Sequence, residues 1–421
     1  MYIAGKVSVA SRRTSLFALL VIFFIDNLGL SIVYPIFGPL ILHSQYHLVD
    51  PDLSKATLNI LIAILIAIFS IAQFFGAPFW GDMADQFGRK KIFYFTILGT
   101  LVGYILSGIS LELSSYTLLF ISRLISGFFA GNLSLCLSSI ADLNPDEKKR
   151  AKTYGWVSTL GGISWVIGII LGGESVSPHV FHFLNPSTPF WATAILTLIS
   201  FATLMFLYQE THPTKKKVKV DLLKAVHHII ETLRNKNLRL LYLILFFWML
   251  GWSLSITWFS SFSTERFNVT IPYIMWALVI LGIIWGLGSS LTNGYLLKKL
   301  SLKNIVVIGL GMTGILMIIG GFLPTFISFA ALYIIASHFA AFTWSNTLNL
   351  VSISAPGDVQ GRTMGFGQSM LSLAQLLAPI AGGLIADVSL KYLYVYAGVS
   401  ILIGLVFLVV TLIFKHEIRK T

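Results

Sequence analysis

Two ionisable residues interrupt long apolar stretches, which makes them the first candidates for chemistry. Asp26 lies in FIDNLGLSIVYPIFGP, and Arg123 lies in a later apolar run, LFISRLISGFFAG. Burial favours the neutral form of a carboxyl group, whereas a nearby arginine favours the ionised form. Asp26 could therefore take up and release a proton, and Arg123 could position or tune that carboxyl group. The alternative for Arg123 is a structural arginine that backbone carbonyl groups satisfy.

A second group of charges is concentrated in the segment GDMADQFGRKK, residues 81–91. Its glycines tolerate left-handed backbone, so two helices could be joined there within a few residues. The spacing indicates a charged latch, and the alternative is a solvated turn that only orients the neighbouring helices. The residues that define the pattern are Gly81, Asp85, Gly88, Arg89 and Lys90.

The elements that must position these residues are membrane-spanning helices. The chain has 421 residues, of which 56% are hydrophobic and 11% charged, against about 25% charged residues in soluble domains. A span needs roughly 20 apolar residues to cross the hydrocarbon core. Polar residues divide the chain into twelve spans near 16–42, 57–80, 92–111, 116–141, 154–173, 190–208, 238–262, 272–297, 303–323, 325–350, 362–386 and 391–414. Pro35 and Pro39 lack a backbone N–H and predict a bend in the outer half of the first span.

The basic residues orient these spans. Of the 29 Lys and Arg residues, all except Lys55, Arg123, Arg266 and Lys391 fall on one side if both termini are cytoplasmic. This distribution follows the positive-inside rule, so the net charge of +12 predicts a membrane protein and not a nucleic-acid-binding protein. We expect both termini in the cytoplasm.

The chain also carries an internal repeat. RAKTYG at 150–155 corresponds to QGRTMG at 360–365, and GIILGG at 168–173 corresponds to APIAGG at 378–383, both with an offset of 210 residues. Parallel repeats of this kind build transporters whose substrate site lies between the halves. We predict an N-terminal six-helix bundle at 1–208, a cytoplasmic linker with an amphipathic helix at 209–237, and a C-terminal six-helix bundle at 238–421.

Residues 81–91 resemble the loop signature G-x-x-x-D-x-x-G-R-K-x of the major facilitator superfamily. The resemblance implies an all-α membrane protein with twelve transmembrane helices in two pseudo-symmetric six-helix bundles. It also implies that Asp85 faces the start of span 11 near Arg362 and that Arg89 pairs with Asp142 at the inner end of span 4. Span 4 is similar to the family's span-4 motif, in which Gly127 allows a neighbouring helix to approach closely.

Span 1 resembles that of drug:proton antiporters, particularly the tetracycline-exporter branch, through D-x-x-G-x-x-x-x-x-P from Asp26. The antiporter signature G-P-x-x-G-G is matched in span 5 except that Ile169 replaces its proline, which weakens the export interpretation. The corresponding segment of span 11 keeps a proline. The resulting helix-packing candidates are Gly168, Gly172, Gly173, Pro379, Gly382 and Gly383.

In the family the substrate cavity is lined by spans 1, 4, 7 and 10, which suggests candidates for substrate binding. Apart from Asp26 and Arg123 these spans hold no buried charge, which favours an amphipathic, aromatic or weakly cationic substrate. The alternative for the tryptophans is a position at the membrane interface. The candidates are Asn27, Tyr34, Asn132, Trp252, Trp258, His338, Trp344 and Asn346.

The function that we expect is secondary active export of a small amphipathic compound, coupled to protons and working by alternating access. Uptake of a metabolite or siderophore, by symport or facilitated diffusion, is the alternative. A membrane-embedded enzyme is disfavoured because the spans hold no nucleophile or His/Asp/Glu constellation. We expect no metal and no cofactor beyond the proton gradient, with the bilayer and the small molecule as partners of a monomer in a bacterial inner membrane.

Overall fold

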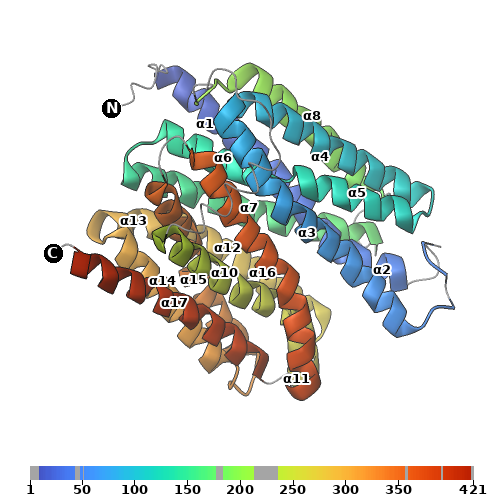
Figure 1. The fold of residues 1–421 in the computed structure, drawn as a ribbon. Coiled ribbons are helices and arrows are strands. Elements are labelled where there is room, and N and C mark those ends of the chain that lie inside the picture. The colour runs from blue at the N-terminus through green and yellow to red at the C-terminus, as the bar shows by residue number, and fades with distance from the viewer. Residues whose placement is uncertain are drawn as a thin grey trace. The chain divides into compact units, whose positions relative to one another are not determined.

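The computed structural model describes residues 9–42, 48–50, 52–176, 184–212, 236–355, 359–389 and 392–418. Every regular element in these residues is a helix (Figure 1). The helices are α1 (Val9–Ser31), α2 (Val33–Leu42), α3 (Lys55–Phe87), α4 (Arg89–Glu112), α5 (Tyr116–Phe129), α6 (Asn132–Leu143), α7 (Glu147–Val176), α8 (Thr188–Leu207), α10 (Lys236–Thr257), α11 (Phe259–Phe267), α12 (Ile271–Leu287), the π-helix η2 (Gly288–Thr292), α13 (Asn293–Lys299), α14 (Leu302–Gly320), α15 (Phe326–Ser354), α16 (Gln360–Ser389) and α17 (Leu393–Ile418).

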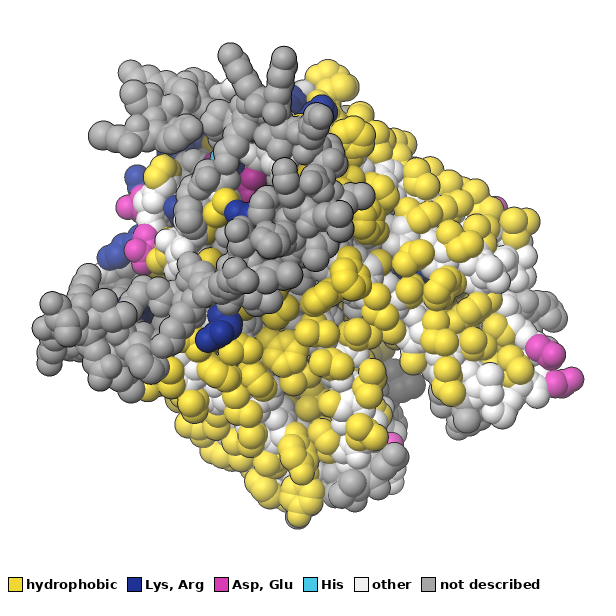
Figure 2. All heavy atoms as spheres, in the orientation of Figure 1, with side chains coloured by type: hydrophobic (Ala, Val, Ile, Leu, Met, Phe, Trp, Pro, Cys, Tyr) yellow, Lys and Arg dark blue, Asp and Glu magenta, His cyan; other side chains and the backbone are white. Residues whose placement is uncertain are grey.

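Twelve segments of the described chain are long and apolar enough to cross a membrane, which confirms the predicted number of spans. Hydrophobic side chains cover most of the visible described surface, and the visible charged side chains lie mainly toward its edges (Figure 2). Large apolar side chains such as Phe75, Trp276 and Ile327 are more than half exposed. A surface of this kind fits a lipid environment, because a water-soluble protein exposes few large apolar patches.

The described residues form two compact units. Unit 1 comprises residues within 1–145, 164–220 and 357–368, and unit 2 comprises residues within 146–163, 221–356 and 369–421. Thus α7 and α16 each contribute residues to both units. The predicted boundary segment lies mostly outside the described residues, because residues 213–235 are not described. The proposed linker helix therefore stays a prediction.

Span 1 is divided where its prolines predict a bend. Helix α1 ends at Ser31, Ile32 is a turn, and α2 begins at Val33. Pro35 cannot donate to the carbonyl of Ser31, so the helical ladder is interrupted there. The Ser31 hydroxyl lies 3.2 Å from the carbonyl oxygen of Ser164 on α7, to which it donates.

Span 4 is also divided, which its apolar sequence did not predict. Helix α5 ends at Phe129 and α6 starts at Asn132, with Ala130 and Gly131 non-helical between them. A helix break inside a membrane needs partners for the freed carbonyl groups. One face of α3 supplies them: Gln73 donates to the Ala130 carbonyl at 3.1 Å, and the Trp80 indole donates to the Phe128 carbonyl at 2.9 Å. Sequence hydropathy contains no information about such partners.

Gly155 and Gly365, which correspond to each other in the internal repeat, have the same packing role in their respective units. In unit 1 a Cβ at Gly365 would lie against the backbone carbonyl of Ala77 on α3. In unit 2 a Cβ at Gly155 would overlap the backbone carbonyl of Ser289 on η2. Both positions therefore require close approach of two helix backbones, which only glycine permits. The 210-residue offset read from the sequence thus corresponds to one repeated helix contact.

Candidate functional site

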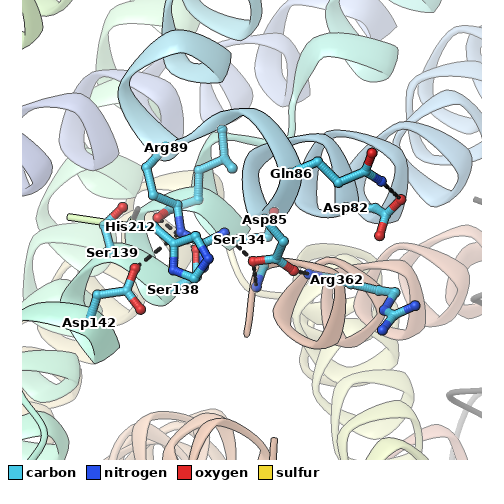
Figure 3. Close-up of polar contacts among 12 residues, drawn as sticks. Asp82, Asp85, Gln86, Arg89, Ser134, Ser138, Ser139, Asp142, His212 and Arg362 are labelled. Atoms are coloured by element: carbon cyan, nitrogen blue, oxygen red, sulfur yellow. Dashed lines mark hydrogen bonds and ion pairs between the residues drawn. The ribbon is translucent and has the colours of Figure 1, made fainter. Parts of the chain in front are cut away.

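Asp85, near the end of α3, contacts the first residues of α16 within unit 1. Its two carboxylate oxygens accept hydrogen bonds of 2.8 Å from the backbone N–H groups of Gly361 and Arg362. These are among the first N–H groups of α16, which have no partner within their own helix and favour a negative charge. Gly81, one turn earlier on α3, lies directly against the Gly361 carbonyl. Figure 3 shows the Asp85 side chain pointing to this helix end.

Arg89 lies between two carboxylates. Its Nη1 is 2.7 Å from Asp85 Oδ1, and its Nε is 3.2 Å from Asp142 Oδ2 (Figure 3). The Arg89 side chain is 0% exposed, so its charge has left water and depends on these partners. Gly88, which joins α3 to α4, has φ of 94°, a conformation that favours glycine. The charged segment is therefore largely helical, and a single glycine makes the turn.

Glu210, which the sequence analysis did not select, completes this cluster. Its carboxylate accepts hydrogen bonds of 3.0 and 2.9 Å from the backbone N–H groups of Arg89 and Lys90, the first two residues of α4. Gly88 has no side chain that could cap α4, and Glu210 supplies the missing acceptor. Lys90 in turn donates its ammonium group to the Met205 carbonyl of α8 at 3.1 Å.

Tyr208 connects the end of α8 to the same cluster. Its hydroxyl group forms hydrogen bonds of 2.9 Å with Ser139 of α6 and with Thr211. The Thr211 hydroxyl in turn donates to Asp142 at 3.3 Å. Burial raises the pKa of the Tyr208 phenol, so this group stays neutral and can donate a hydrogen bond. We call the set Asp85, Arg89, Asp142 and Glu210 the latch cluster.

Asp26, the carboxylate of the first span, has a neutral partner. Asn132 Nδ2 donates to Asp26 Oδ1 at 2.9 Å. Asn132 is the first residue of α6, so the break in span 4 places this amide beside α1. Asn27, the other candidate on this turn, donates instead to the Phe23 carbonyl of its own helix at 3.0 Å.

Arg123 has an aromatic environment. Its guanidinium carbon lies 4.4 Å from the ring centroid of Phe69 and 5.6 Å from that of Phe37, a geometry that favours a cation. The side chain is buried, and its Nε and Nη1 have no hydrogen-bond acceptor among the described residues. Among the described residues, no ion pair joins Arg123 to Asp26. The structure therefore brings both residues into unit 1 without pairing their charges directly.

The remaining substrate candidates are divided between the units. In unit 1 the Tyr34 ring lies 5.0 Å from that of Trp165. In unit 2 Trp252 lies 4.8 Å from Trp285 and stacks on Tyr333.

Other candidates in unit 2 are held by neighbouring residues. Asn346 is fully buried and donates to Asn293 Oδ1 at 2.7 Å, and Trp344 is buried as well. His338 is partly buried beside Gly288 of η2, and Trp258 lies against Gly382 of α16. Burial at this level gives Asn346 and Trp344 a packing role in this structure.

The helix-packing candidates behave differently from one another. A Cβ at Gly127 would overlap the Phe69 carbonyl, and one at Gly168 would overlap the Ser31 hydroxyl. Gly172 lies against Ile32 at the break of span 1. Gly173 has open space where a Cβ would stand, so nothing in the described residues supports its predicted packing role, which stays a prediction. The difference arises because only one face of α7 meets span 1.

In span 11, the Trp258 indole fills the space beside Gly382 in which a Cβ would stand. Gly383 makes only an ordinary van der Waals contact with the same indole. Pro379 lies inside α16 without ending that helix.

Comparison with known sequences decides the family. The profile described as Major Facilitator Superfamily matches residues 19–293 and 243–420 of the chain. The chain belongs to the Major Facilitator Superfamily. It is therefore an integral, multi-pass membrane transporter of a small molecule and not an enzyme, and the resemblance read from the charged segment is confirmed.

Curated relatives of this superfamily member include drug-resistance proteins. Multidrug resistance protein 2 of Bacillus subtilis (strain 168) is 26% identical over 95% of this chain and 96% of its own length. Tetracycline resistance protein, class H, of Pasteurella multocida is 24% identical, with 97% of both chains covered. Tetracycline resistance protein, class B, of Escherichia coli is 25% identical over 69% of this chain and 68% of its own length.

Solved structures show the same superfamily fold. The human organic anion transporter MFSD10 (TETRAN) superposes with a TM-score of 0.80 at 18% identity, covering 94% of this chain and 99% of that one. FucP, a Major Facilitator Superfamily transporter in the outward conformation, superposes with a TM-score of 0.71 at 14% identity, covering 95% and 99%. At this identity the likeness concerns the fold alone.

Proposed function

We propose that this transporter exports small amphipathic compounds by alternating access, in exchange for protons that bind Asp26. The observation that carries the proposal is the Asp26–Asn132 hydrogen bond of 2.9 Å, inside two segments apolar enough to span a membrane. A carboxyl group in that environment is retained at a considerable energetic cost, so it is a functional candidate by default. Asn132 can serve both protonation states of Asp26, because its amide offers a donor and an acceptor.

The curated relatives support the direction of transport and the substrate class. Three of them are named for resistance to tetracycline or to several drugs, and resistance is the outcome expected of an exporter. The low charge of the predicted cavity spans favours an amphipathic compound over a phosphorylated anion. We therefore propose tetracycline-like and cationic aromatic molecules as the substrate class.

We also propose how transport is powered and where the protein acts. The proton gradient supplies the energy, with no metal and no other cofactor. The protein acts as a monomer in a bacterial inner membrane with both termini in the cytoplasm, as the distribution of Lys and Arg favours.

The latch cluster gives the proposal a conformational element. Asp85 binds the start of α16 only while α3 and α16 are adjacent, since its two hydrogen bonds require contact with that helix end. Alternating access would break and remake these bonds in each cycle. The cluster thus acts on the rate of conformational change, whereas Asp26 acts on energy coupling.

Everted membrane vesicles test the proposal. Vesicles that contain the transporter are acidified inside, and tetracycline or ethidium is added while a pH-sensitive dye reports the gradient. Antiport predicts that the added compound releases protons from the vesicles. Asp26→Asn should abolish this release, while Asp50→Asn, a matched change at an exposed residue outside the spans, should leave it intact. Uptake by symport predicts no release on addition from this side, and that result would overturn the export proposal.

A further inference from the structure

Tyr104 of α4 lies at the junction of three helices in unit 1. It is 5% exposed, and its hydroxyl group occupies the space beside Gly29 of α1 in which a Cβ would stand. Gly29 comes three residues after Asp26, so the two share one face of α1. The Tyr104 hydroxyl is therefore held against the backbone one helical turn from the Asp26 carboxylate.

Close contacts between α4 and α5 lie on both sides of Tyr104 along α4. Gly103 lies against the hydroxyl of Ser126, and Ser107 forms a 2.8 Å hydrogen bond with Ser122. These contacts flank Tyr104 on α4 and Arg123 on α5, which brings the two helices into close approach at this level.

Tyr104 interacts electrostatically with both Asp26 and Arg123, which form no ion pair with each other among the described residues. Arg123 leaves Nε and Nη1 without an acceptor among the described residues, and Asn132 leaves Oδ1 without a donor there. A phenol both donates and accepts hydrogen bonds, so it could serve either group.

We propose that Tyr104 is a positioning residue for proton exchange at Asp26, whose hydroxyl group donates to the ionised carboxylate and orients it toward Arg123. The inference rests on the proposed role of Asp26 as the proton carrier. Tyr104 keeps its own proton throughout, so only Asp26 changes protonation state. In the structure the Asp26 carboxyl group accepts a hydrogen bond from Asn132, and in this scheme the neutral state keeps that contact.

Two other ionisable groups near this site each interact with only one of the two charged residues: Tyr34 interacts electrostatically with Arg123, and Cys136 with Asp26. The Tyr34 ring of α2 packs on Trp165, and the Cys136 thiol of α6 donates to the Leu19 carbonyl at 3.6 Å. From α8, the residue that reaches Gly29 is Thr193, whose side chain does not ionise. Tyr104 is thus distinguished by interacting electrostatically with both charged residues.

Infrared difference spectroscopy on the purified, full-length protein tests this inference without any substrate. The protonated carboxyl band of Asp26 is assigned by its loss in Asp26→Asn and is then titrated with pH. Tyr104→Phe removes the hydroxyl group that would stabilise the ionised Asp26 carboxylate. The midpoint of the Asp26 band should therefore move to higher pH by about one unit. Tyr94→Phe on the same helix, whose ring packs on Phe201, is the matched control and should leave the midpoint unchanged.

Two results would overturn the inference, and they differ in meaning. If the Asp26 band titrates in Tyr104→Phe as it does in the parent protein, Tyr104 does not position the carboxylate, and the proposed function is unaffected. If the parent protein has no titrating band assignable to Asp26, the proton-coupling role fails and the role of Tyr104 fails with it. A general loss of structure in Tyr104→Phe would broaden the amide bands, which the same spectra report.

Discussion

The backbone N–H of Gly361 donates a 2.8 Å hydrogen bond to the carboxylate of Asp85, although the two residues are 276 positions apart in the chain. The same carboxylate accepts from Arg362 and pairs with Arg89. One buried negative charge therefore holds together the end of α3, the start of α4 and the start of α16. Removing that charge should affect all three helix ends at once.

Asp85→Asn should slow transport while leaving substrate binding intact. The amide oxygen can accept one N–H group, but the second hydrogen bond and the charge opposite buried Arg89 are lost. A hydrogen bond to a charged group contributes about 1.5–3 kcal/mol, so we expect the rate to fall by about tenfold or more. Rates of tetracycline transport and binding affinities measured in the same preparation check this.

The matched control for that variant is Asp82→Asn. Asp82 lies three residues earlier on α3 and accepts a 2.7 Å hydrogen bond from Gln86 of its own helix. We expect a much smaller effect on the transport rate. Equal losses in both variants would contradict a specific role for the Asp85 contact with α16.

Glu210→Gln should lower the stability of the protein. The change removes the negative charge at the first turn of α4, where two backbone N–H groups bind this carboxylate. Loss of a helix cap costs about 0.5–2 kcal/mol, which should appear as a lower melting temperature in detergent. Glu265→Gln, at an exposed position of α11, should melt like the parent protein, and identical melting of Glu210→Gln would argue against the cap.

Much of this arrangement can be predicted from sequence because most of these charged residues lie in recognisable local sequence patterns. Asp26 stands out as a carboxylate in an apolar span, and the spacing of Asp85 and Arg89 follows a known loop signature. Glu210 is different, because it caps a helix that starts 121 residues earlier. No local pattern links the two positions, so only the fold reveals their contact.

Broken helices mark a second limit of prediction. Prolines in the sequence predict the break at Ile32. The break at Ala130–Gly131 depends instead on hydrogen-bond donors from α3, which a hydropathy pattern does not predict. Its consequence is the position of Asn132, which pairs with Asp26 where Arg123 was the expected neighbour.

Trp80→Phe should destabilise the break in span 4. The substitution keeps an aromatic ring but removes the indole N–H that donates to the Phe128 carbonyl. A buried acceptor left without a partner costs about 1–3 kcal/mol. The measurement is thermal unfolding in detergent, with Trp156→Phe at an exposed position of α7 as the control. An unchanged melting temperature would mean that water or another donor replaces the indole.

Gly155→Leu and Gly365→Leu should each impair transport strongly, since a side chain at either position would push two helix backbones apart. Gly173→Leu, in open space on α7, should retain transport. Tetracycline efflux from cells that express each variant at equal levels measures this. Transport by Gly155→Leu and Gly365→Leu at the parent rate would show that the repeated glycine contact is dispensable.

The most direct test of proton coupling compares two modes of transport by Asp26→Asn in proteoliposomes. One assay follows exchange of labelled for unlabelled tetracycline without a gradient, and the other follows uphill accumulation driven by a proton gradient. Because the variant keeps a hydrogen-bonding side chain beside Asn132 but cannot lose a proton, exchange should continue while accumulation disappears. Accumulation at the parent rate would contradict the assignment of Asp26 as the proton-binding residue.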